Sequence, residues 1–153
     1  MPEAPSQVDI SHNDELWIGR TVASVLEWTQ IYGIESLPFP DQVPDDIDIT
    51  HQQSPGRTRE TKPGLLPVAD FTQEKQYWPA HAGDVLIEEL SALTAAGTRE
   101  EVLFEFHIEG AARRTYRGYV NSFTPTGEVG GKRMASMNAK IFERQPTNER
   151  VIA

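Results

Sequence analysis

The sequence predicts a mainly β protein of the α+β type: an antiparallel β-sandwich or barrel with one packed α-helix and a long inter-strand loop. Apolar and polar residues alternate in 101–109 and 133–144, a single helical stripe occupies 84–96, and Pro- or Gly-rich turns separate the segments. A chain of 153 residues suits one domain. We therefore expect a flexible arm over residues 1–15, the domain over 16–145 and a C-terminal tail over 146–153.

The first ordered segment is expected to begin near Trp17. From Arg20 to Ile34, β-branched and aromatic residues dominate, which favours one or two strands. Four apolar residues would share one face of such a strand: Val22, Leu26, Trp28 and Tyr32. A helix is the alternative, because Val22, Val25, Leu26 and Thr29 also fit a period of 3.6.

Prolines interrupt the next stretch, "SLPFPDQVPDD", and exclude a regular element there. A short strand is expected from Ile47 to His51, followed by the long loop over 52–67. A further strand is expected from Asp70 to Trp78, where Phe71 alternates with polar partners.

One helix is expected, from Asp84 to Ala96. Leu86, Leu90 and Leu93 form its apolar stripe. Asp84 can cap the N-terminus, and Gly97 can end the helix in the left-handed conformation.

The remaining segments predict three antiparallel strands. The first alternates between a core face, Val102, Phe104, Phe106 and Ile108, and a solvent face, Glu101, Glu105, His107 and Glu109. Its hairpin partner is expected over Arg114–Phe123. After the loop "TPTGEVGGK", the last strand would bury Ala135, Met137, Ala139 and Ile141.

The formal net charge of −9 is concentrated at the N-terminal end. Residues 1–50 carry ten acidic residues against the single Arg20, whereas residues 51–153 carry thirteen of each sign. Such a field repels polyanions, so a DNA-binding domain is disfavoured. No apolar run is long enough to span a bilayer and no signal-peptide pattern is present, so we expect a soluble cytoplasmic protein without membrane partners.

No motif for catalysis, metal or cofactor binding stands out. The chain has no cysteine, and no two of its four histidines have the spacing of a helical metal pair. The stretch "GEVGGK" lacks the spacing of a phosphate-binding loop. We therefore expect a protein that is not an enzyme and needs no cofactor or metal.

The long loop is basic within an acidic chain. Arg57, Arg59 and Lys62 outnumber Glu60 there, giving a local charge of +2. A loop of this length is usually functional or disordered. Its nearest acidic complement is Asp41, Asp45, Asp46 and Asp48, which could meet the loop within one subunit or across a subunit boundary. A solvated loop whose charges have no partner remains the alternative.

The run from Glu27 to Leu65 resembles the signature region of major tail tube proteins of long-tailed, lambda-type phages. That family shows Trp-Thr-x-Ile, a Leu-Pro turn, an Asp-x-Thr strand and a Ser-x-Gly-x-x-Arg-Glu loop ending in Pro-Gly-Leu. The matching residues are Trp28, Thr29, Ile31, Leu37, Pro38, Asp48, Thr50, Ser54, Gly56, Arg59, Glu60, Pro63, Gly64 and Leu65. The resemblance covers roughly residues 20–143, with the sharp motif confined to about forty of them.

The resemblance implies a structural subunit that forms stacked hexameric rings and a hollow tube in a virion tail, assembled in the host cytoplasm. DNA would pass through without specific binding, and tape-measure and tail-terminator or tail-tip proteins would be partners. The inter-subunit loop would consist of Ser54, Gly56, Arg57, Arg59, Glu60, Lys62, Pro63, Gly64 and Leu65. Asp41, Asp45, Asp46 and Asp48 would either bind this loop or face the lumen.

Two other classes of function stay open at this point. A monomeric ligand-binding β-barrel would use Trp28, Trp78 and Tyr77 around an apolar pocket. An acid/base enzyme would use His107 with Glu105 or Glu109.

Overall fold

The structure is a computed structural model and describes residues 14–40, 42–53, 55–108, 113–127 and 129–145. Six strands form one antiparallel sheet in the order β2-β1-β6-β7-β8-β5, and two short strands pair separately. The elements are β1 (Glu15–Val22), β2 (Val25–Ile31), β3 (Asp46–Asp48), η1 (Pro55–Arg57), β4 (Thr61–Pro63), β5 (Ala69–Gln76), α1 (Ala82–Ala95), β6 (Val102–His107), β7 (Arg114–Thr126) and β8 (Met134–Gln145). The predicted mainly β fold with one helix is confirmed.

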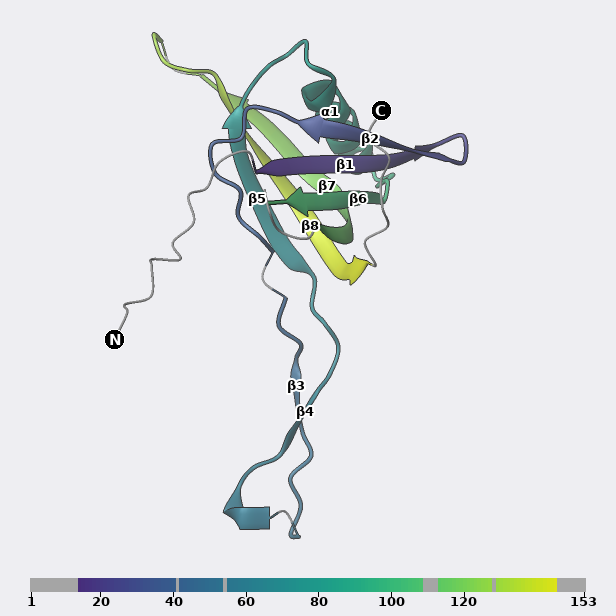
Figure 1. Cartoon of the computed structure of the whole chain (residues 1–153), viewed down its shortest axis with the longest axis vertical. Coiled ribbons are helices and arrows are strands. Elements are labelled where there is room, and N and C mark those ends of the chain that lie inside the picture. The colour runs from purple at the N-terminus through teal and green to yellow at the C-terminus, as the bar shows by residue number, and fades with distance from the viewer. Residues whose placement is uncertain (1–13, 41, 54, 109–112, 128, 146–153) are drawn as a thin grey trace, which may run out of the picture.

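The core lies on the side of the sheet that α1 covers, where the helix contacts β7 and β2 (Figure 1). The buried apolar residues come from all six strands of the large sheet and from the helix: Leu16, Ile18, Ile31, Phe71, Ile87, Leu90, Val102, Phe104, Phe106, Tyr116, Val120, Ala135, Met137, Ala139 and Ile141. The predicted core faces of β6 and β8 are therefore confirmed, except that Ile108 follows β6 and is only half-buried.

The Arg20–Ile34 region contains the end of β1 and the whole of β2, which pair as an antiparallel hairpin, so the helical alternative is wrong. The turn residues Ala23 and Ser24 both have positive φ, of 50° and 66°, as expected of a two-residue turn. The expected apolar face is wrong in part, since Val22 and Leu26 are 43% and 42% exposed. The reason is that β1 pairs with β6 only as far as Gly19, so the end of the hairpin projects beyond the sheet (Figure 1).

The predicted helix is confirmed as α1, but its N-terminal cap is not Asp84. His81 caps the helix, because its Nδ1 atom accepts from the backbone N–H of Gly83 at 3.2 Å. Asp84 instead lies in the first turn and points into the interior. At the other end Gly97 has φ +84°, as predicted. Thr94 fixes the helix to the sheet by donating to the carbonyl of Val120 at 2.6 Å.

The predicted solvent face of β6 is wrong at Glu105, which is buried. In the sheet Glu105 lies between Trp17 of β1 and Thr115 of β7, and Arg113 Nη1 is 3.8 Å from its carboxylate. Strand β6 is central, so side chains of β1 and β7 flank Glu105 on both sides and can bury it. The alternation of polar and apolar residues within β6 does not show this burial.

Gly118 allows β7 and β8 to approach each other closely. A Cβ atom at this position would lie 2.2 Å from the carbonyl oxygen of Lys140. We expect Gly118→Ala to lower the free energy of unfolding by about 2–3 kcal/mol through overpacking. Gly127→Ala is the matched control, because its Cβ would meet nothing closer than 3.9 Å. Urea unfolding followed by circular dichroism checks both variants, and equal stability of the two would contradict the prediction.

An elongated arm leaves the domain between β2 and β5 and carries β3, η1 and β4 (Figure 1). The predicted loop 52–67 is thus the outer and returning part of a longer hairpin. The strand expected at Ile47–His51 is present in part, as β3 over Asp46–Asp48, and three residues of the expected loop form β4. No helix in the described parts of the chain has both the length and the apolar composition that crossing a membrane requires.

Candidate inter-subunit surfaces

The arm is held together by a short antiparallel ladder. Ile47 pairs with Lys62 in register, and the ladder continues outside the strands through Ile49 N–H to Glu60 O at 3.0 Å and Asp45 N–H to Leu65 O at 3.0 Å. Gly64 fits closely against the opposite strand, since a Cβ would lie 3.0 Å from the Ile47 side chain and 3.1 Å from the Asp45 carbonyl.

Polar contacts shape the outer part of the arm. The backbone N–H of Thr50 donates to Asp48 at 2.9 Å, and the Thr50 hydroxyl accepts from Glu60 N–H at 2.8 Å. Hydrogen bonding by the Thr50 hydroxyl and backbone lowers the pKa of Asp48 below its usual range. At the tip, Gly56 adopts φ 68° within η1, a conformation that favours glycine.

The arm brings the predicted basic and acidic residues together. Arg59 Nη1 lies 3.6 Å from Asp48 Oδ2 across the hairpin, with both side chains exposed. Gly56 and Arg57 lie in η1, Lys62 and Pro63 in β4, and Glu60, Gly64 and Leu65 beside β4. Asp46 and Asp48 form β3 and Asp45 precedes it, whereas Asp41 and Ser54 lie outside the described residues. The contact of these residues with other subunits stays a prediction.

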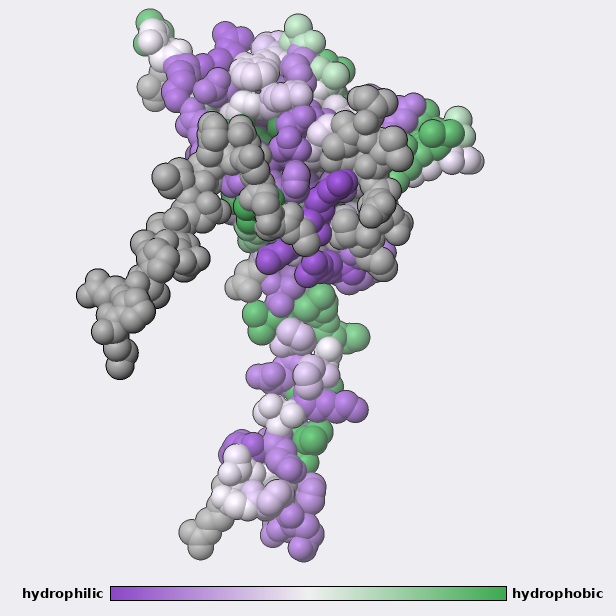
Figure 2. Space-filling view, viewed as in Figure 1, coloured by the Kyte–Doolittle hydropathy of each residue, from purple (hydrophilic) through white to green (hydrophobic). Residues whose placement is uncertain are grey.

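Exposed apolar side chains run along the arm, a feature that the charge pattern did not predict. They are Val43, Ile47, Ile49, Leu65, Leu66 and Val68. Figure 2 shows hydrophobic surface where the arm joins the domain and again further along it (Figure 2). An isolated two-stranded hairpin is at best marginally stable in water. Exposed apolar patches are typical of interaction sites.

The β1–β2 hairpin presents a second exposed apolar surface, made of Val22, Val25 and Leu26 (Figure 2). Arg20, in the β1 strand of this hairpin, forms ion pairs with two carboxylates: its Nη1 lies 3.1 Å from Glu89 and its Nη2 lies 2.9 Å from Glu100. The hydrogen bonds that Arg20 donates to Glu100 and then to Glu89 raise the pKa of Arg20 above its usual range. The projecting hairpin is therefore anchored to the helix side of the domain.

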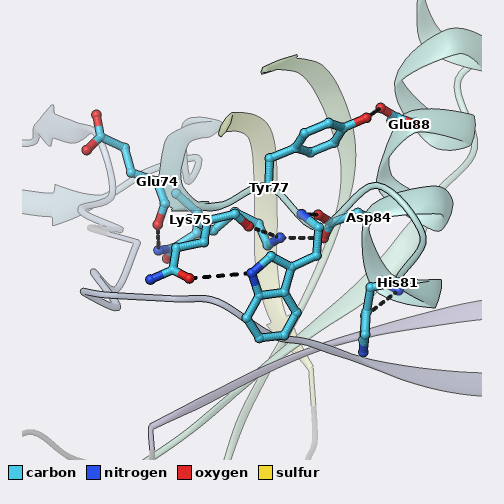
Figure 3. A network of polar contacts seen from close by, with 10 residues as sticks. Glu74, Lys75, Tyr77, His81, Asp84 and Glu88 are labelled. Atoms are coloured by element: carbon cyan, nitrogen blue, oxygen red, sulfur yellow. Dashed lines mark hydrogen bonds and ion pairs between the residues drawn. The ribbon is translucent and has the colours of Figure 1, made fainter. Parts of the chain in front are cut away.

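A buried ion pair lies where β5 ends and α1 begins, at the end of the domain away from the arm (Figure 1). Figure 3 shows this pair and its hydrogen bonds. Lys75 of β5 and Asp84 of α1 are bonded to each other, with side chains 0% and 1% exposed. Lys75 Nζ also donates to the Gln76 carbonyl at 2.7 Å, and Asp84 Oδ2 accepts from Trp78 N–H at 2.6 Å. The pair thus ties the end of β5 to the start of α1.

The aromatic residues proposed for a ligand pocket do not converge. Tyr77 donates to Glu88 and packs against Phe123 with ring centroids 5.8 Å apart. Trp78 instead stacks with Tyr32, and Trp28 covers Gly19 on the β1–β2 hairpin. The sequence could not show this, because adjacent residues in a turn can point to different neighbours.

The acid/base arrangement is equally incomplete in the described residues. His107 Nδ1 lies 3.4 Å from Glu15 Oε2, a partner that the sequence did not suggest, and Glu109 lies outside the described residues. Glu105 is buried near Arg113. Within the described parts of the chain, no group of three or more His, Asp or Glu side chains could hold a metal ion.

The sheet face of β5, β7 and β8 that points away from the core carries a row of polar side chains. Asn121 donates to Asn138, and Asn138 donates to Thr72, each at 3.3 Å, so the side chains form a row across the three strands. Lys140, two residues after Asn138 on β8, is paired with Asp70 of β5. This row therefore presents amide and hydroxyl groups, and the charge of the adjacent Lys140 is balanced by Asp70.

Comparison with known proteins relates the fold to phage-like tails. No protein-family model and no curated protein matches the sequence. Among solved structures, a chain of the SPP1 tail tube is 12% identical with a TM-score of 0.62, over 86% of this chain and 74% of that chain.

Two further solved structures show the same likeness. A chain from the tail of an empty GTA particle, refined with C6 symmetry, is 17% identical with a TM-score of 0.64, over 87% of this chain and 96% of that chain. A chain from the sheath/tube terminator of the extracellular contractile injection system PVC, in its extended state, is 13% identical with a TM-score of 0.56. The match covers 94% of this chain and 96% of that chain. The chain described here therefore has the fold found in these tail structures.

Proposed function

We propose that this protein is a structural subunit of a phage or phage-like tail tube, which assembles with its own copies into stacked hexameric rings around a conduit for DNA. The observation that carries the proposal is the shared fold, which extends over 86% or more of the chain in three tail structures. Six-fold symmetry is the symmetry of the GTA tail, and we propose the same ring for this chain.

The two exposed apolar surfaces suit such an assembly. The arm and the β1–β2 hairpin project from the domain in different directions (Figure 1), and their apolar residues differ. Contacts between unlike surfaces are heterologous, and they generate rings or open-ended filaments instead of closed dimers. We propose that the hairpin contacts a neighbour within the ring and that the arm contacts the adjacent ring.

The polar face of β5, β7 and β8 suits the wall of the conduit. Phosphates bind where Lys and Arg can displace their counterions. The row Asn121, Asn138 and Thr72 offers no free cation, and Lys140 is neutralised by Asp70. The net charge of −9 further disfavours adhesion of DNA. Asp45, Asp46 and Asp48 lie on the arm, so we propose that they serve the arm's contacts and not the lumen.

The proposal assigns the protein a structural role without catalysis. Its location would be the virion tail, after assembly in the host cytoplasm. Tape-measure and tail-terminator or tail-tip proteins would be its partners besides its own copies.

Electron microscopy of the purified protein across a concentration series tests the proposal, with light scattering on the same samples. We expect six-fold rings or hollow tubes, and a reconstruction with Asn138 on the inner wall. A monomer at every concentration, even with tail-tip proteins added to initiate assembly, would contradict a tube subunit. Tubes with Asn138 on the outer wall would contradict only the assignment of the conduit face.

A further inference from the structure

Three aromatic rings form an exposed cluster that neither the core nor the proposed conduit uses. Tyr32 follows β2, Trp78 follows β5, and His81 caps α1. Tyr32 and Trp78 are stacked with centroids 6.3 Å apart and an interplanar angle of 12°. His81 meets both rings edge-on, at 4.9 Å and 5.7 Å. The first two side chains remain 43% and 40% exposed, so part of each ring faces solvent.

Hydrogen bonds to neighbouring residues hold Trp78 and His81 of the cluster in place (Figure 3). The backbone N–H of Trp78 donates to the buried carboxylate of Asp84, and its indole Nε1 lies 3.4 Å from Gln76 Oε1. The ring of His81 is oriented by its bond to Gly83 N–H. A preorganised surface loses little conformational entropy on binding, which favours its use as a contact.

The cluster lies at the far end of the domain from the arm. Strand β5 leaves the arm and runs across the domain, and α1 begins beyond its far end (Figure 1). The arm itself points away from the domain along the longest axis of the molecule. The arm of one chain therefore points away from its own cluster. In copies stacked head to tail, the arm of one copy would point toward the end of the next copy that carries the cluster.

The chemistry of the two ends is complementary. Arg59 on the arm is 86% exposed, and its ion pair with Asp48 is solvent-exposed and hence weak. A guanidinium stacks well on aromatic faces, and Trp is the strongest partner for a cation. The exposed Ile47 and Ile49 of the same arm could cover Val85, which is exposed on the first turn of α1 near His81.

We propose that Arg59 of one copy stacks on the Tyr32–Trp78 cluster of the next copy, an inference that rests on the proposed tube function. The partner of the basic arm would then be an aromatic surface, the Tyr32–Trp78 cluster, and not an acidic one. It also explains why the arm carries exposed apolar residues as well as charge.

Cross-linking of full-length chains tests the contact, because the native chain has no cysteine. Thr58→Cys on one chain leaves Arg59 intact, and Val85→Cys marks the cluster on another. A short bis-maleimide added to the mixed assembly should link the two variants. Ala95→Cys, at the opposite end of the same helix, is the matched control and should not be linked. Tubes without a Thr58→Cys/Val85→Cys link, or with an equal link to Ala95→Cys, would overturn the inference alone. Failure of the native chain to form tubes, even with tail-tip proteins added, would overturn the proposed function as well.

A second pair of variants isolates the aromatic contribution. Trp78→Leu should raise the lowest concentration at which tubes form by about tenfold, whereas Trp78→Phe, which keeps a ring, should raise it less. Light scattering measures this threshold, and circular dichroism confirms that both variants are folded. Equal thresholds for the native chain and Trp78→Leu would overturn the inference.

Discussion

Deletion of Arg57–Lys62 is expected to abolish tubes while leaving the domain folded. The deleted residues lie on the arm, and their described contacts are to other arm residues such as Asp48 and Thr50. Shortening such a hairpin changes the closure entropy only slightly. We therefore expect a midpoint of thermal unfolding within about 2 °C of the native value. Circular dichroism measures the fold, and electron microscopy measures the loss of tubes.

The control for this deletion is replacement of the same six residues by Gly and Ser. It keeps the length of the arm but removes its side chains. Loss of tubes in both variants would show that assembly needs the side chains of these six residues. Loss of tubes in the deletion variant alone would show that assembly needs the length of the arm. An unfolded deletion variant would contradict the separation of arm and domain, and normal tubes in both variants would contradict a role for the arm in assembly.

Asp84→Ala is expected to lower the free energy of unfolding by about 3–5 kcal/mol. The substitution leaves the ammonium group of Lys75 buried without its counter-charge and removes the acceptor of Trp78 N–H. Both losses fall at the junction of β5 and α1. Urea unfolding followed by Trp fluorescence measures the change, and a difference below about 1 kcal/mol would contradict the prediction.

The double variant Lys75→Met/Asp84→Leu separates charge from packing. Replacing both members of a buried pair by apolar residues is often neutral, because no charge is left without a partner. We expect the double variant to recover most of the stability that Asp84→Ala loses. A double variant as unstable as Asp84→Ala would show that the hydrogen bond to Trp78, and not the charge, is the larger contribution.

The sequence predicts best the elements whose two faces have different neighbours. In β8, one face packs on the core and the other is polar, so Ala135, Met137, Ala139 and Ile141 could be assigned from alternation alone. In α1, the Leu stripe and Gly97 sufficed for the helix and its C-terminal end. Ile87, buried beside Leu90, fell outside that stripe but obeys the same period.

The sequence fails where long-range contacts decide the environment of a residue. Lys75 and Asp84 lie in different elements, and no local pattern shows that they bury each other's charge. The apolar residues of the β1–β2 hairpin have the pattern of core residues, yet Val22 and Leu26 project beyond the sheet because β6 is shorter than β1. The charges of the arm were visible in the sequence, whereas its extended hairpin shape depends on pairing between Asp45–Ile49 and Glu60–Leu65.

The two edges of the large sheet differ in a way that bears on aggregation. β5 forms one edge, and the segment after β2 shields part of it: Gln76 N–H donates to Gly33 O at 2.8 Å, Ile34 bridges to Lys75, and the Gln73 side chain donates to Ser36 O at 2.6 Å. β2, at the other edge, begins at the turn of the projecting hairpin. Open strand edges are templates for uncontrolled pairing between chains. Because part of the β5 edge is already covered, the sheet cannot add strands freely in both directions. Fibril-like growth through sheet edges is thereby disfavoured, while ordered stacking through the arm stays possible.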